Sequence, residues 1–329
     1  MKPRLSRLRT VTAFALALGL TLVGAACDKG GDQTNKPGAG KNGGTVATEQ
    51  PKDGGKDYVY AAEGFVLTAT TKIKFDIASS QGSGAAELSA RSLLEATPAD
   101  GDKLKVHGKV LELIGYKGSG QLDPEFIKKQ AQEQGGEAVD IVAELGKAES
   151  WLIIDRKGEL DEAATKALAE NQTDEDQSLD FGLFNLPDLP RIDLVEGEKI
   201  TLPTKEVERQ SLVGKIPVEI DESWTLRKIG PDRIAEIDVT SEGSGATVLS
   251  GGQGSANVSM LEESSYTILF NLDTKLPVSV SGYSQSELQL DIEGQSESIT
   301  VSSNSEVEGR YEPGAASAPA AAPATAAEG

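Results

Sequence analysis

The two residue types most common in zinc sites and in nucleophile–base pairs, histidine and cysteine, each occur only once in this sequence. The chain contains one histidine, His107, and one cysteine, Cys27. Zinc sites need clusters of such residues, which excludes a zinc enzyme. The same scarcity excludes Ser-His-Asp and Cys-His catalysis unless His107 itself serves, and no G-x-S-x-G motif is present. Because His107 alternates with apolar neighbours, we predict a solvated strand histidine.

Motifs for phosphate and cations are equally weak. No Gly-Lys pair is followed by Ser or Thr, as a phosphate loop requires. The glycine-rich stretch 243–254 follows a strand pattern, so we expect a hairpin loop there, with a ligand-contacting loop as the alternative. The acidic run 174–176 offers oxygen ligands for Ca²⁺, but its spacing is not that of an EF-hand. Among 52 acidic residues no carboxylate pair for glycoside hydrolysis stands out. We therefore expect no metal, no cofactor and no enzymatic activity.

Cys27 follows a segment that is typical of secretion signals. An uncharged run from Thr10 to Ala26 comes after a basic start, which is the order expected of a signal peptide. The basic residues are Lys2, Arg4, Arg7 and Arg9. Seventeen residues of helix span only ~25 Å, less than the ~30 Å hydrocarbon core of a bilayer. We therefore predict a signal peptide over residues 1–26 and no spanning helix in the mature chain.

The residues around the predicted cleavage point resemble the lipobox of bacterial lipoproteins. Three small residues, Gly24, Ala25 and Ala26, precede Cys27, although Gly24 departs from the usual leucine at its position. The resemblance implies a diacylglycerol on the Cys27 sulfur, cleavage between Ala26 and Cys27, and acylation of the new amino group. The alternative is an ordinary cleaved signal with Cys27 as a free thiol, which is unusual in a secreted protein. Two or more acyl chains anchor a protein stably.

The charge balance restricts the partners. The chain carries a net charge of −20, and removal of the four basic residues of the leader leaves −24. Such a surface repels nucleic acid and anionic headgroups, so we expect no nucleic-acid partner and membrane attachment only through the lipid on Cys27. We predict a location in the cell envelope, facing the periplasm. Asp28 resembles an inner-membrane retention signal, whereas Lys29 weakens that signal. The sequence therefore leaves the inner and the outer membrane as alternative locations of the anchor.

Composition divides the rest of the chain into three parts. Residues 27–57 comprise the lipidated cysteine and a glycine-rich tether with a reach of ~30 Å. Residues 58–312 form the folded body, and the Ala/Pro-rich residues 313–329 form a tail that does not pack.

Period-2 alternation dominates the folded body. The apolar positions of Phe65 to Ile77 predict one half-buried strand of about thirteen residues. The same alternation recurs within 216–226, 235–239, 266–272 and 288–292, and 230–232 and 271–275 are expected turns. One apolar and one polar face is typical of an antiparallel sheet. We predict a mainly β (α+β) fold, with long antiparallel strands in a twisted sheet, half-barrel or open barrel.

Helical patterns are limited to the middle of the chain. Pro124 fits a first turn, Ala138 to Leu145 have helical spacing, and Asp161 begins a third short pattern in which Ala164, Ala167 and Leu168 face inward. Halves 58–185 and 191–312 look loosely alike, which suggests an internal duplication with residues 186–197 as the crossing between them.

The body resembles the large, uncharacterised β-rich lipoproteins of Gram-negative envelopes. It is similar more distantly, in architecture alone, to half-barrel carriers that move lipoproteins or lipids across the periplasm. The predicted anchor, the long tether, the long one-sided strands and the absence of catalytic motifs together favour a membrane-anchored, non-enzymatic binding or carrier module for an apolar ligand or partner. One alternative is a structural or assembly lipoprotein that docks a basic envelope component. A carboxylate-dependent hydrolase is a more distant alternative.

Overall fold

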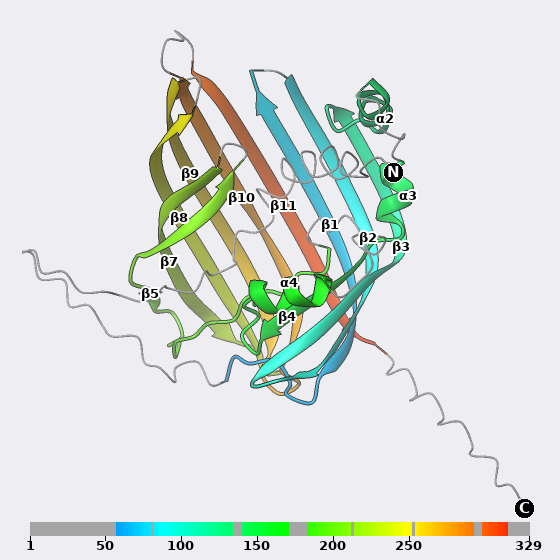
Figure 1. Cartoon of the computed structure of the whole chain (residues 1–329). Helices are drawn as coiled ribbons and strands as arrows, with labels where there is room; N and C mark the ends of the chain where they lie inside the picture. Colours follow the sequence, from blue (N-terminus) through cyan, green and yellow to red (C-terminus); the bar gives the residue numbers. More distant parts are fainter. Residues whose placement is uncertain are drawn as a thin grey trace, which may run out of the picture.

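The protein folds into one open antiparallel sheet (Figure 1). The computed structural model describes residues 57–80, 82–133, 140–170, 183–211, 214–251, 254–292 and 298–314. Within these residues the sheet has eleven strands, ten of which follow the order β4-β3-β2-β1-β11-β10-β9-β8-β7-β5. The eleventh strand, β6, also pairs with β7, along a different stretch of that strand from β5. The strands in chain order are β1 (Phe65–Ser79), β2 (Gly82–Ala99), β3 (Lys103–Gly120), β4 (Glu149–Asp155), β5 (Lys199–Thr201), β6 (Lys205–Ser211), β7 (Gly214–Ile229), β8 (Ile234–Gly251), β9 (Gly254–Asn271), β10 (Leu276–Ile292) and β11 (Ile299–Pro313).

The predicted fold class is confirmed, and the strands are longer than their apolar patterns. The strand predicted over Phe65 to Ile77 is β1, with 15 residues. The turns at 230–232 and 271–275 join β7 to β8 and β9 to β10. The suggested duplication stays a prediction.

The first and last strands meet in the middle of the sheet. β1 and β11 pair from Leu67 opposite Pro313 to Ser79 opposite Val301. Gly314 extends this contact, because its backbone N–H donates to the Val66 carbonyl at 2.8 Å. The ordered strand therefore runs just past the predicted start of the tail at residue 313.

Three short helices follow β3 and β4 in the described part of the chain. They are α2 (Pro124–Glu133), α3 (Ile141–Leu145) and α4 (Glu162–Glu170). The Asp161 carboxylate accepts from the Ala164 N–H at 3.0 Å, which confirms the predicted cap of α4. Ala167, however, is exposed, because α4 lies along the edge of β4 and buries less of its surface than the apolar pattern indicates.

Alternate side chains define an inner face, whose residues form the core, and an outer face in contact with solvent. A first apolar cluster joins Ile154 of β4 with Trp224 of β7, which lie near opposite ends of the strand order. The sheet must therefore curl, so that both flanks contact the same core. We call residues 183–198, which precede β5 and include the predicted crossing, the crossing segment. Its residues Leu189 and Ile192 fill the space between these flanks.

A second apolar cluster joins inner side chains of β1 and β2 with residues of the helices beside β3. Ile127 of α2 and Leu145 of α3 pack there with Phe184 of the crossing segment. Phe184 lies against β3 at Gly108, where a Cβ would come within 2.5 Å of the ring. These contacts place α2, α3 and the start of the crossing segment on the inner face beside β3 (Figure 1).

The glycine-rich stretch 243–254 contains the connection between β8 and β9 only at its end, and most of it is strand, contrary to the predicted loop. Residues up to Gly251 continue β8, and Gly254 already begins β9. The reason is steric, because a Cβ on Gly245 would lie 2.2 Å from the Pro217 carbonyl oxygen of β7. Glycine allows the strands to approach closely at this position, so here it indicates a curled sheet and not a loop.

Candidate functional site

A row of serines crosses the inner face of the sheet. Ser305 of β11 lies opposite Ser284 of β10, and Ser284 lies opposite Ser264 of β9. The row continues through Ser241 of β8 to Glu222 of β7. With strands ~4.8 Å apart, these five residues span ~19 Å. Hydroxyls thus occupy positions where a folded core usually carries apolar groups.

A second polar row runs parallel to the first. It contains Ser303 of β11, Ser286 of β10 and Glu262 of β9. The Ser286 and Ser303 hydroxyls are 2.8 Å apart. We call the two rows together the polar belt, which consists of Ser241, Ser264, Ser284, Ser286, Ser303, Ser305, Glu222 and Glu262.

Apolar rows border the polar belt on both sides. Val301, Leu288 and Met260 lie opposite one another on the side of the β8–β9 turn. On the other side lie Tyr266, whose hydroxyl is hydrogen-bonded to Ser284, and Val239. Burial raises the pKa of Tyr266, so this phenol stays protonated and able to donate. The polar belt is therefore a narrow hydrophilic band within an apolar surface.

Basic side chains of β6 neutralise both carboxylates of the polar belt. Arg209 forms a two-pronged contact with Glu262, with Nη2 at 2.8 Å from Oε1 and Nε at 3.1 Å from Oε2. Their side chains are 15% and 16% exposed. Lys205 Nζ lies 3.0 Å from Glu222 Oε2, and the Trp224 indole N–H donates to Glu222 Oε1 at 2.5 Å. The polar belt with these partners has no net charge.

Asp188 of the crossing segment adds a perturbed carboxyl near Glu222. Burial, with the Glu222 carboxylate adding to it, raises the pKa of Asp188 to about 8. Asp188 therefore carries a proton at neutral pH and is able to donate a hydrogen bond. Perturbed carboxyls of this kind are common at functional sites, although ion-pair networks also produce them.

The crossing segment is held in place by Tyr60, which precedes β1, and by residues of the turn after β4. The Tyr60 hydroxyl donates to the Pro187 carbonyl at 2.6 Å, and the Lys157 ammonium donates to the Pro190 carbonyl at 2.9 Å. Arg191 lies 2.5 Å from both Asp155 and Glu159. Burial, with repulsion from Arg191 adding to it, lowers the pKa of Lys157 to about 8. Asp188 is thus presented to the inner face by a well-anchored backbone.

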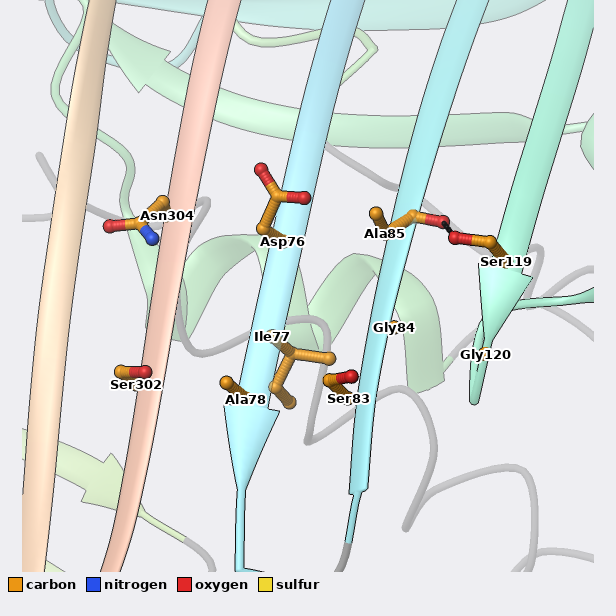
Figure 2. Close-up of a pocket in the computed structure, with 10 residues that line it drawn as sticks. All are labelled: Asp76, Ile77, Ala78, Ser83, Gly84, Ala85, Ser119, Gly120, Ser302 and Asn304. Atoms are coloured by element: carbon orange, nitrogen blue, oxygen red, sulfur yellow. Dashed lines mark hydrogen bonds between the residues drawn. The ribbon is translucent and has the colours of Figure 1, made fainter.

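A separate shallow pocket lies at the ends of β1, β2, β3 and β11 (Figure 2). Its volume is about 280 Å³. Asp76, Ala85 and Ser119 lie opposite one another on the outer face, with Asn304 on the other side of Asp76. The lining is a mixture of small polar and apolar groups, and Asp76 and its neighbours on the outer face are separated from the polar belt by the thickness of the sheet. This pocket is not the apolar cavity that a carrier of apolar ligands needs.

His107 lies on the outer face, as predicted, but the expectation of a solvated ring is wrong. Its imidazole stacks on Trp151 at a centroid distance of 4.0 Å, and Nε2 lies 2.5 Å from Glu149. Lys105 covers Trp151 at 4.2 Å from the ring centroid. The ring of His107 is only 15% exposed. No local pattern indicates this stack, because Trp151 reaches His107 only through the pairing of β3 with β4.

The other predicted site residues lie outside the described residues. These are the lipobox residues Gly24, Ala25, Ala26 and Cys27, and the acidic run 174–176. Within the described ranges no three His, Cys, Asp or Glu side chains are grouped in a way that would hold a metal ion. In the same ranges no helix is long and apolar enough to cross a bilayer.

The fold and site define a mainly β protein with an open, curled antiparallel sheet, and comparisons with known proteins add no family to this description. No family model matches the chain, and no curated protein matches it. Among solved structures, kievitone hydratase from Nectria haematococca is 8% identical, with 83% of this chain and 97% of that chain covered. The TM-score of 0.12 is too low to support any structural or functional argument.

Proposed function

We propose that this protein is a lipid-anchored lipoprotein of the cell envelope that binds an apolar ligand, or an apolar part of a partner, without catalysis. Cys27 carries the anchor in this proposal, and residues 27–57 form the tether. The binding surface is the inner face of the sheet. The lipobox-like leader supports the proposed location in the cell envelope, and the open curled sheet supports the proposed binding role.

A third apolar cluster is the observation that carries the binding role. It is made by β6, β7, β9 and β10, with side chains of β11 packed against it. Its buried members are Val207, Ile216, Val218, Ile220, Val258, Met260, Leu288 and Leu290. Unlike the other two clusters, it contains no helix or crossing-segment residue within the described chain. This end of the inner face is thus apolar, and the side chains that bury it come from the curled sheet alone.

Docking of a basic partner on the outer face receives less support. Many outer carboxylates already have basic neighbours, such as Glu306 with Lys74 at 2.6 Å and Glu87 with Lys72 at 3.0 Å. Arg227 pairs with Asp238 in the same manner. The high negative charge is therefore partly compensated on the sheet itself.

Uptake of an apolar probe tests the proposed function. The full chain, extracted from envelopes, should carry lipid in native mass spectrometry and should enhance the fluorescence of N-phenyl-1-naphthylamine. Met260→Gln introduces a polar group into the third cluster and should weaken probe uptake. Leu261→Gln is the matched control, because Leu261 is the next residue and is 58% exposed on the outer face.

The folding of both variants is checked by circular dichroism, and Met260→Leu, which keeps the apolar lining, should retain uptake. A wild-type chain that carries no lipid and does not enhance probe fluorescence would contradict the proposed function. Equal uptake by Met260→Gln and Leu261→Gln would show that the third cluster is not the binding surface.

A further inference from the structure

We infer that the polar belt binds the uncharged headgroup of an amphipathic lipid of the acylglycerol class, while the acyl chain lies on the third apolar cluster. This inference rests on the proposed function and identifies the ligand class for the same inner face. It follows from hydrogen-bonding groups without partners, from the charge balance of the belt and from the position of the belt next to apolar rows.

Two buried hydroxyls of the polar belt have no hydrogen-bond partner among the described residues. Ser264 is 9% exposed and Ser305 is 5% exposed, and both lie on the inner face in the same row. Polar groups at such depth are normally hydrogen-bonded, so unpaired ones require an explanation. Neither hydroxyl oxygen is completely sealed, in contrast to that of Ser92. A ligand that brings hydroxyl or ester oxygens would supply the missing partners.

The charges of the belt exclude an anionic headgroup. Glu222 and Glu262 are each neutralised by one basic side chain, Lys205 and Arg209. No cationic charge of the belt is left over to form the strong charge-assisted hydrogen bonds with which Arg and Lys bind a phosphate or a free carboxylate. Serine hydroxyls both donate and accept, so they match the hydroxyl and ester groups of a glycerol headgroup. The acidic chain as a whole disfavours anions as well.

The neighbouring rows provide a place for the acyl chain. Met260 lies two residues from Glu262 on β9, and Leu288 lies two residues from Ser286 on β10, so both side chains are on the same face as the belt. The headgroup and the chain of one lipid are therefore accommodated by adjacent rows. An entirely apolar ligand would leave the hydroxyls of Ser264 and Ser305 unpaired.

The test removes these hydroxyls and little else. The double variant Ser264→Ala/Ser305→Ala is compared with Ser92→Ala. This control also deletes an unpaired hydroxyl of the inner face, but on β2 and away from the belt. The full chain of each variant is titrated with monooleoylglycerol, with dioleoylphosphatidylglycerol and with N-phenyl-1-naphthylamine. Loss of two hydrogen bonds should weaken monooleoylglycerol binding about tenfold. Ser92→Ala should bind it as the wild type does.

The three probes separate the inference from the proposed function. Retained uptake of the naphthylamine with selective loss of monooleoylglycerol in the double variant supports the inference. Equal monooleoylglycerol affinity in the double variant and the wild type overturns it, as does tighter wild-type binding of the phosphatidylglycerol, and both leave the proposed function intact. A wild-type chain that binds none of the probes removes both. Because the substitutions remove unpaired polar groups, thermal unfolding should show no loss of stability.

Discussion

Replacing Asp188 by asparagine should make the protein more stable at neutral pH and should remove much of the pH dependence of its stability. Burial and the nearby Glu222 raise the pKa of this carboxyl from 3.8 to about 8. An asparagine amide at this position is neutral at every pH and needs no added proton. The substitution Asp188→Asn therefore keeps the shape of the protonated carboxyl and removes the free energy of protonation.

The sign of the effect follows from proton binding. Between pH 4 and pH 8 the folded state holds a proton on Asp188 that the unfolded state has released. The wild type therefore loses stability as pH rises through this window, and its stability levels off above pH 8. One pH unit corresponds to ~1.4 kcal/mol, so the protonation costs up to ~4 kcal/mol at pH 7. Partial exposure of Asp188 reduces this, and a gain of ~2 to 4 kcal/mol is expected for Asp188→Asn.

Urea unfolding of the full chain at pH 4.5, 6, 7 and 8.5 measures this effect. The free-energy difference between Asp188→Asn and the wild type should be close to zero at pH 4.5 and should grow to a plateau above pH 8. Asp232→Asn, in the exposed turn between β7 and β8, controls for the loss of one carboxylate and should show no comparable growth. A constant difference across the pH range, or destabilisation by Asp188→Asn at pH 7, would refute the assigned protonation state.

Three further perturbations test the packing and the anchor. Gly108→Ala should destabilise the protein by ~1 to 3 kcal/mol in urea unfolding, because the new Cβ would lie 2.5 Å from the Phe184 ring, and an unchanged midpoint would contradict this placement of Phe184. Arg209→Met should lower stability by ~3 kcal/mol, since it leaves Glu262 buried without its partner, and Arg209→Met/Glu262→Leu should recover most of the loss. Cys27→Ser should move the chain from the membrane to the soluble fraction in flotation gradients, and continued membrane retention would contradict a sole attachment through the lipid.

Strands with a continuous row of large apolar inner side chains could be predicted from the sequence, and strands in which small or polar residues interrupt that row could not. β1 and β7 have large apolar side chains at alternate positions, which reveals both their type and their buried face. β11 has Ser303, Ser305 and Gly309 between its apolar inner residues, so its hydrophobic alternation is interrupted in the middle of the strand. β2 is similarly rich in alanine and serine. Their positions are fixed by pairing with neighbours far along the chain, which no local pattern contains.

The candidate site could not be predicted for the same reason. Each serine of the polar belt is ordinary in its own strand, and the row exists only through the register of four strand pairs. A partial signal is available, because Ser284 and Ser286 on one strand and Ser303 and Ser305 on another occur two residues apart. Asp188 could not be singled out by its neighbours in the sequence, since its raised pKa depends on burial in the fold and on Glu222, a residue of β7.

The pairing of β1 with β11 sets the order in which this chain can mature. Residues that meet in this pair are separated by more than two hundred positions, so β1 has only one neighbour until the last strand has been synthesised. Contacts of such long range slow folding, and an incomplete chain exposes two unpaired strand edges at the centre of the sheet. In the proposed function the chain crosses a membrane in extended form, and slow closure of the central seam leaves time for this step. The seam cannot close before the last strand has been synthesised, so a truncation before Ile299 should leave β1 with one neighbour and a chain that does not mature.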